Sequence, residues 1–393
     1  MSGSAYLRIA ENVDAGPMTA PKANGDFSPA FIRFLKLLYT PGEAEIVQHL
    51  KMPVATATTL AEVAESMLSA DDIARAAGKS STEVTDVLDA LARKGSVIGF
   101  GGNYGLPLMH ILVNQLQFTK EIGPDDVEAG QLYQQFFIKD GFYKYYENSE
   151  KGTRVVRVIP VQRTVRSGQQ ILETEEVHKI IDAVSNLSLV PCPCRTRTEK
   201  LGIRECKNDT PVGFCIMMET SALYFQSIGV GRKVTAEEAK KYFDEMQDLG
   251  LVGTTENYEE AGHTVICLCC QCCCSQLRGR TRWDNPQAVA PSNFIAESTD
   301  ECIMCGHCVD RCFFGAIALD EDQEKSVVDA EKCMGCGVCT ITCDQEALRL
   351  KRVEREKPFP SASKLLGTIA AENQEGRKRI RAATPDALFR PVD

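Results

Sequence analysis

The chain has 393 residues, 44% of them hydrophobic and 25% charged, the usual balance of a globular protein with two or three domains. No apolar run approaches the roughly eighteen residues of a membrane-spanning helix, and the start lacks an apolar signal core, so we expect a cytoplasmic protein. The net charge of −10 argues against a chain devoted as a whole to nucleic acid or anionic lipid. All 18 cysteines lie between Cys192 and Cys343, which indicates metal or cluster ligands instead of the disulfides of a secreted scaffold.

The N-terminal part of the chain predicts an arm followed by a small helical domain. Residues 1–27 are rich in Gly, Pro, Ala and Asn and are expected to form a flexible arm. From Ser28 onward, capping hydroxyls precede several helical patterns, and a turn at Gly101-Gly102 then separates two short apolar runs, which is a hairpin signal. This order of helices and hairpin resembles a winged helix-turn-helix domain over 28–110.

A winged helix-turn-helix domain suggests DNA binding, but the charges of this segment argue against it. The candidate recognition helix, 81–95, carries Glu83, Asp86 and Asp89 against two basic residues at its far end. Residues 28–110 contain seven basic and nine acidic residues, which is unfavourable for contacts with phosphate. We therefore favour a protein-docking role for this domain, and DNA stays as the alternative partner.

The middle of the chain predicts a connector at 111–190 and a cysteine-rich α/β domain at 191–297. Two helical patterns lie between Cys215 and Cys267. We expect them to fold back as a hairpin and to bring these two cysteines near each other.

An internal repeat with an offset of 31 residues follows in a domain expected at 298–352. Each copy has the spacing C-x2-C-x2-C-x3-C, and glycines within the loops allow close approach of the backbone to a bound group. With this spacing, the fourth cysteine of each run ligates the other cluster. The spacing thus predicts two [4Fe–4S] clusters, the first held by Cys302, Cys305, Cys308 and Cys343, and the second by Cys333, Cys336, Cys339 and Cys312.

The repeat resembles the bacterial two-cluster ferredoxin family over about 55 residues. The family usually has proline after each fourth cysteine, whereas Phe313 and Asp344 stand there in this chain. Because proline binds no iron, we expect ligation to persist and the shielding of the clusters to differ.

A second cysteine region precedes the ferredoxin repeat and contains the PCPCR and CLCCQCCC elements. These elements resemble an uncharacterised group of iron–sulfur proteins from anaerobes. Adjacent cysteines project in different directions, so at most three or four of the six thiols at 267–274 are expected to meet one centre. We favour at least one further iron–sulfur cluster, and structural zinc or a redox-active thiol–disulfide centre remain open. The candidate ligands are Cys192, Cys194, Cys206, Cys215, Cys269, Cys270, Cys272 and Cys273.

Four basic residues lie close in sequence to the first of these cysteines: Arg195, Arg197, Arg204 and Lys207. They are expected either to stabilise thiolate and sulfide charge or to form a solvated basic loop.

The predicted fold is α+β and multidomain, with a winged-helix-like N-terminal domain, a cysteine-rich α/β middle domain, a C-terminal ferredoxin-like domain and a basic tail at 353–393. No nucleotide-binding, Walker, haem or Ser/His/Asp motif is evident, so we expect no catalytic residues and treat enzymatic activity as undecided. The sequence favours an electron-transfer subunit or partner of a larger anaerobic oxidoreductase. The alternatives are a redox-responsive transcription regulator and a thiol-based reductase.

Overall fold

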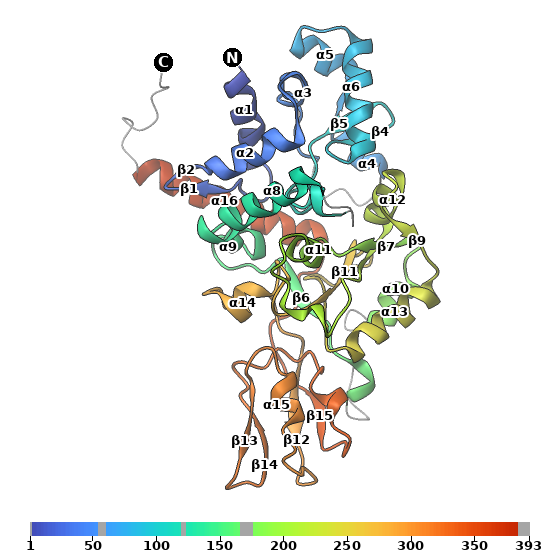
Figure 1. Cartoon of the computed structure of the whole chain (residues 1–393), viewed down its shortest axis with the longest axis vertical. Coiled ribbons are helices and arrows are strands. Elements are labelled where there is room, and N and C mark those ends of the chain that lie inside the picture. The colour runs from blue at the N-terminus through green and yellow to red at the C-terminus, as the bar shows by residue number, and fades with distance from the viewer. Residues whose placement is uncertain (1, 54–59, 119–122, 166–175, 384–393) are drawn as a thin grey trace.

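The computed structural model describes residues 2–53, 60–118, 123–165 and 176–383 (Figure 1). Helices gather at the N-terminal end of the molecule, a mixed helix-and-strand region lies in the middle, and the ferredoxin repeat projects at the opposite end (Figure 1). Among the described residues, no helix combines the length and the apolarity that crossing a membrane requires.

The predicted flexible arm is wrong for the described residues between 2 and 27. They form helix α1 (Ser2–Asp14) and a small hairpin of β1 (Lys22–Ala23) and β2 (Asp26–Phe27). Tyr6, Ile9 and Val13 recur at helical spacing and are buried, so the segment has an apolar face that its small and polar residues obscure in the sequence. Residue 1 lies outside the described part.

The next segment contains the helices and the hairpin that the sequence predicts. Ser28, Thr40, Ser69 and Ser80 each cap the N-terminus of a helix through a side-chain oxygen. The elements are α2 (Pro29–Leu38), α3 (Pro41–Val47), α4 (Leu60–Glu65), α5 (Ala70–Ala77) and α6 (Ser81–Lys94), with a three-stranded antiparallel sheet in the order β3 (Leu68–Ser69), β5 (Asn103–Gly105) and β4 (Ile98–Phe100).

An aromatic core joins this segment to the following helices. Phe31 and Phe34 of α2 pack edge-on against Phe136, and Tyr133 stacks on Phe137 with ring centroids 4.5 Å apart. The elements here are α7 (Met109–Leu112), α8 (Pro124–Tyr133), a π-helical turn (Gln134–Lys139) and α9 (Tyr143–Glu147).

The middle region is built on a six-stranded antiparallel sheet. Its strand order is β6 (Val156–Val158), β10 (Val252–Glu256), β11 (Val265–Cys269), β8 (Phe214–Met218), β7 (Leu187–Pro191) and β9 (Arg232–Lys233). The helices are α10 (Val177–Asp182), α11 (Pro193–Lys200), α12 (Glu219–Ser227), α13 (Ala236–Asp248) and the short α14 (Arg278–Arg282). Helices α12 and α13 are the predicted pair between Cys215 and Cys267, and they return the chain so that β8 and β11 are neighbours.

The ferredoxin repeat forms two small antiparallel sheets. Strand β12 (Phe294–Ser298) pairs with β15 (Leu348–Arg352), and β13 (Ile317–Asp320) pairs with β14 (Lys325–Val328). A short helix, α15 (His307–Arg311), follows the first cysteine loop.

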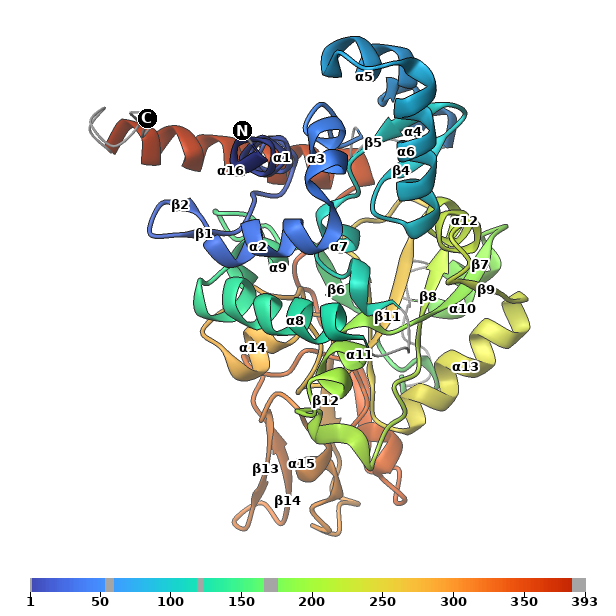
Figure 2. The same cartoon turned by 45° about the horizontal axis from the view of Figure 1, so that its top comes forward.

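The predicted basic tail contains α16 (Ala362–Ala383), and residues 384–393 lie outside the described part. Helix α16 runs back beside the N-terminal helices (Figures 1 and 2). There the Asn373 side chain donates a hydrogen bond to the Pro17 carbonyl, 2.9 Å away. Helix α16 and the segment that follows α1 therefore pack on each other.

Candidate metal and cluster sites

The first ferredoxin group is the more exposed of the two, with Cys305 at the surface. A small cavity is lined by the four thiols predicted for the first cluster, those of Cys302, Cys305, Cys308 and Cys343. The backbone N–H of Ser326 points at the Cys302 sulfur, 3.4 Å away. Burial acts to raise the pKa of Cys302, and the backbone N–H groups of Met304 and Ser326 outweigh it, so that the pKa is lowered. The cavity and its donors fit an anionic iron–sulfur cluster, and ligation itself stays a prediction.

The second ferredoxin group is enclosed by protein. Cys333, Cys336 and Cys339 are all buried. The strongest electrostatic neighbours of Cys339 are Cys336, Cys312 and Cys333, the other members predicted for the second cluster, and Cys308 of the first group follows them. Burial raises the pKa of Cys336 to about 12. Its thiol would therefore be protonated at neutral pH, and metal binding there must release a proton. The two groups differ in exposure: Cys305 is exposed, and the thiols of the second group are not.

Ten upstream cysteines divide into two separate groups, and both draw on the run at 267–274. One group is a closed ring in which each thiol interacts with two others in the order Cys192, Cys194, Cys274, Cys269, Cys267, Cys215 and back to Cys192. We call this set the six-thiol ring. The Cys274 and Cys269 sulfurs are 3.0 Å apart.

Sheet register assembles the six-thiol ring. Cys215 lies on β8 and Cys267 on the neighbouring β11, and the antiparallel pairing of Ile216 with Ile266 brings the two cysteines alongside. Cys267 and Cys269 are two residues apart on one strand and so face the same side, while Leu268 between them enters the apolar core on the other. The predicted approach of Cys215 to Cys267 is confirmed.

Three arginines are buried around the ring. Arg195, Arg197 and Arg278 are 1%, 0% and 6% exposed. Among the described residues no ion pair joins Arg195 or Arg197 to a carboxylate, whereas Arg278 interacts electrostatically with the buried Glu147. Each of the three keeps at least one N–H group that lacks a hydrogen-bond acceptor. A buried cation needs a compensating negative charge. The interpretation of the basic residues as a solvated loop is therefore wrong for Arg195 and Arg197, and also for Arg204, which is 9% exposed; it holds for Lys207, which is exposed.

Ser275 ties the ring to its surroundings. Its hydroxyl accepts hydrogen bonds from Tyr133 at 2.7 Å and from Arg197 at 3.0 Å, and it lies 3.3 Å from the Cys194 sulfur. The Arg197 guanidinium also lies over the Tyr133 ring, 3.5 Å from its centroid. The six-thiol ring thus lies between α8 of the helical part and the central sheet.

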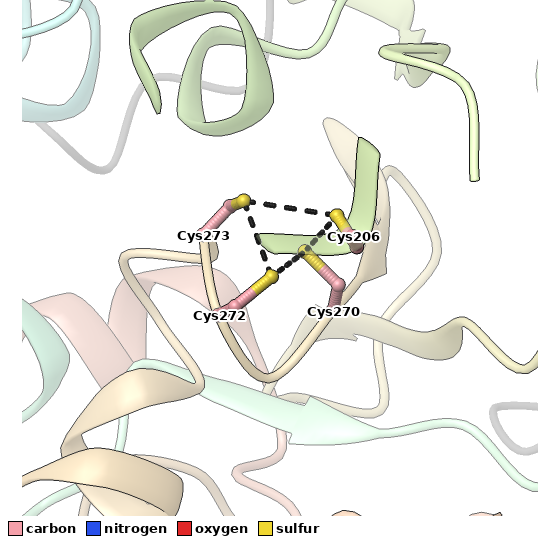
Figure 3. A group of neighbouring side chains, drawn as sticks. All are labelled: Cys206, Cys270, Cys272 and Cys273. Carbon is pink, nitrogen blue, oxygen red and sulfur yellow. Dashed lines mark hydrogen bonds between the residues drawn. The ribbon is translucent and has the colours of Figure 1, made fainter. Parts of the chain in front are cut away.

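The second upstream group consists of Cys206, Cys270, Cys272 and Cys273, whose four sulfur atoms lie within 4.8 Å of one another (Figure 3). We call it the four-thiol site. Cys206 comes from a single 3₁₀ turn (Glu205–Lys207), and the other three come from the turn that follows β11. Cys270 and Cys273 are buried, whereas Cys206 and Cys272 are half-buried.

The structure thus separates thiols that the sequence treats as one candidate set. Three of the six cysteines at 267–274 face the ring and three face the four-thiol site, in agreement with the expectation that not all six meet one centre. Cys267 and Cys274 were not among the predicted ligands and belong to the ring. Cys267 could have been predicted, because it alternates with Cys269 along a strand and so faces the same side. Nothing in the sequence indicated Cys274.

Comparison with known proteins adds evidence for the C-terminal part. Residues 301–347 match the family model of the 4Fe-4S dicluster domain. These residues form an iron–sulfur ferredoxin module. Together with the cysteine content of the chain, the match supports multiple [4Fe–4S] clusters. No solved structure matches the chain.

The curated relatives match over short segments. An archaeal-type glutamate synthase [NADPH] of Thermotoga sp. (strain RQ2) is 35% identical over 63 residues, which are 16% of this chain and 12% of that protein. Pyruvate synthase subunit PorD of Methanothermobacter marburgensis is 36% identical over 53 residues, 14% of this chain and 59% of the subunit. The polyferredoxin-like subunit of an aliphatic sulfonate oxidoreductase from Pyrococcus furiosus is 27% identical over 99 residues, 23% of this chain and 53% of that subunit. The chain thus spans only 12% of the length of the glutamate synthases.

Proposed function

We propose that the protein is a cytoplasmic electron-transfer component of a larger anaerobic oxidoreductase. Two clusters would be held by the eight ferredoxin cysteines, and a further iron–sulfur cluster by the six-thiol ring. Bound clusters supply one-electron transfer. The chain's own part is to hold them close together, to exclude water and to offer one exposed end to a partner.

The observation that carries this proposal is a shared apolar core between the two cysteine regions. Cys336 of the second ferredoxin group is buried in the same side-chain cluster as Cys269 and Cys274 of the ring. The backbone N–H of Val161, which follows β6, donates a hydrogen bond of 2.9 Å to the Cys336 carbonyl. The ferredoxin loop that carries Cys336 therefore packs directly on the sheet that carries the six-thiol ring.

The exposed end of the ferredoxin module suits a redox partner. Ile303 is 63% exposed and Leu319 is 40% exposed, and both line the cavity that contains the first group of thiols. Exposed apolar side chains around a cofactor edge favour transient protein contacts. The relatives that are named as subunits of pyruvate synthase and of a sulfonate oxidoreductase support the same role for this chain.

We assign protein docking to the winged-helix-like domain at 28–110. Two of its basic side chains are engaged with acidic neighbours, Lys79 with Glu83 and Arg75 with Asp72. On α6, Asp89 accepts a hydrogen bond from the Tyr104 hydroxyl at 2.6 Å. An acidic helix with paired bases offers few phosphate contacts. Selection from genomic DNA with the holoprotein tests this assignment, and recovery of one sequence with nanomolar affinity would favour the regulator alternative.

A redox titration of the anaerobically purified full-length protein, followed by EPR, tests the electron-transfer role. We expect at least three reducible clusters with magnetic interaction between neighbours. Changing Cys215→Ser should remove the signal of the ring and leave the two ferredoxin signals. If only two clusters are reduced and the variant behaves as the parent, electron transfer is confined to residues 302–343.

A further inference from the structure

The four-thiol site differs from the other cysteine groups in size. The sulfur–sulfur distances are 3.8 Å for Cys206 to Cys270, 3.9 Å for Cys206 to Cys273, 3.8 Å for Cys272 to Cys270 and 3.4 Å for Cys272 to Cys273. Four sulfurs placed about 2.3 Å from one tetrahedral ion are about 3.8 Å apart along each edge. The site therefore already has the dimensions of a single-ion centre (Figure 3).

The remaining thiols do not share these dimensions. Across the described ranges, which include all 18 cysteines, no other three metal-binding side chains have their ligand atoms within 4.8 Å of one another. The ferredoxin thiols are therefore more widely spaced, as a cubane requires, because each thiolate binds a different iron of the cluster. In the six-thiol ring, too, no three sulfurs lie within 4.8 Å of one another, although the Cys269 and Cys274 pair is 3.0 Å apart. The difference in sulfur spacing between these groups follows from the backbone conformation of the loops that carry them.

We propose that Cys206, Cys270, Cys272 and Cys273 bind one tetrahedral thiophilic metal ion, with Zn²⁺ as the expected occupant, and that they do not hold an iron–sulfur cluster. All four positions are supplied by protein sulfur, which is the closed ligand set of a structural site. This proposal does not depend on the electron-transfer role.

Hydrogen bonds outside the ligand set orient the thiols. The Thr198 hydroxyl donates to the Cys273 sulfur over 3.0 Å, and the Thr210 side chain interacts with Cys206. Arg204 donates to the Thr210 carbonyl and to Glu199, which fixes the loop that carries Cys206. Such outer partners are usual around thiolate sites, where they set ligand orientation.

The position of the four-thiol site indicates a structural role for the bound ion. It would join the loop after α11 to the turn after β11, two segments more than sixty residues apart in the sequence. That turn also carries Cys269 and Cys274, whose sulfurs belong to the six-thiol ring. Closing the turn with one ion would therefore fix two ring thiols, and the half-buried Cys206 and Cys272 leave a route for the ion to enter.

X-ray absorption of the anaerobically purified full-length protein tests the proposal directly. At the zinc edge we expect four sulfur neighbours at about 2.3 Å and no metal–metal scattering. If the site instead holds one iron ion with the same four sulfur neighbours and no sulfide, the single-ion site is supported and its occupant is iron, not zinc. Absence of any such ion, with the four thiols free to react with an alkylating reagent, would overturn the proposal.

Metal and sulfide analysis of variants separates this site from the ring. Cys206→Ser should lose one ion per chain and keep all acid-labile sulfide, whereas the control Cys215→Ser should lose iron and sulfide and keep the ion. A loss of sulfide with about four irons in Cys206→Ser would show a cubane at the site instead. If Cys206→Ser does not fold, the absorption spectrum of the parent protein decides alone.

Discussion

The ferredoxin module and the upstream cysteine region use similar residues in opposite ways. In the module, three thiols of each group come from one short loop, so chain spacing defines the site. In the upstream region, β8 and β11, the turn after β11, the segment from Cys192 into α11, and the loop after α11 contribute thiols, and strand register brings them together. The first arrangement can be predicted from the sequence, whereas the second can be recognised only when the strand pairing is known. Regular spacing of cysteines along the chain therefore identifies cluster ligands far more readily than a large number of cysteines does.

The largest expected effect concerns the backbone of the second ferredoxin loop. Gly335 has φ of +66°, and a Cβ there would overlap the Phe294 carbonyl and the Ser292 hydroxyl. We expect Gly335→Ala to lose about four irons, one cubane, from the module. The matched control is Gly315→Ala, which also has positive φ (+60°) but has open space around it. It should cost about 1–2 kcal/mol, the penalty of a left-handed conformation for a residue with a Cβ, and keep its iron. Equal iron contents in the two variants would contradict the role of close packing.

A smaller effect is expected from the charge next to the six-thiol ring. Replacing the buried cation by Arg197→Gln should disfavour the more negative, reduced state of the ring's cluster. We expect its midpoint potential to fall by about 60 mV, which for one electron equals about 1.4 kcal/mol. Arg197→Lys keeps the charge and should shift the potential less, and Arg282→Gln, at an exposed ion pair with Glu205, should not shift it. Redox titration of each variant measures the midpoint potentials. If only the potentials of the ferredoxin clusters shift, Arg197 does not act on the cluster of the six-thiol ring.

The smallest effect concerns the link between the ring and the helical part. Tyr133→Phe removes the hydroxyl that donates to Ser275 and leaves the aromatic packing in place. We expect a loss of about 1 kcal/mol in the free energy of unfolding, the usual net value of one hydrogen bond. Anaerobic chemical denaturation measures it, with the ferredoxin signals as an internal reference. An unchanged stability would mean that water replaces the hydroxyl at no cost.

Much of the fold followed from local chemistry. The capping hydroxyls predicted from Ser28 onward mark the starts of four helices, at Ser28, Thr40, Ser69 and Ser80. Helix α1 was missed because small residues dilute its apolar face. The burial of Arg195 and Arg197 could not be foreseen, since a run of basic residues is ordinarily solvated. Their partners come from distant parts of the chain: Arg195 donates to the Val212 and Leu268 carbonyls, Arg197 donates to Asn114 and Ser275, and both lie beside the six-thiol ring.

The partition of the upstream thiols was equally beyond the sequence. Spacing indicated Cys192, Cys194, Cys206 and Cys215 as candidate ligands but did not decide which cysteines serve together. In the structure Cys206 lies with Cys270, Cys272 and Cys273, and the other three lie in the six-thiol ring. The pairing of β8 with β11 decides this, and no local motif encodes that register.

The number of irons and sulfides per chain in the anaerobically purified full-length protein tests the central claim, that the upstream thiols add a cluster to those of the ferredoxin module. The two module clusters account for about eight irons and eight sulfides. We expect about four more of each at least, lost again in a Cys192→Ser, Cys215→Ser double variant that keeps the module. A parent protein with eight irons and eight sulfides, and with the ring thiols free to be alkylated, would contradict the claim.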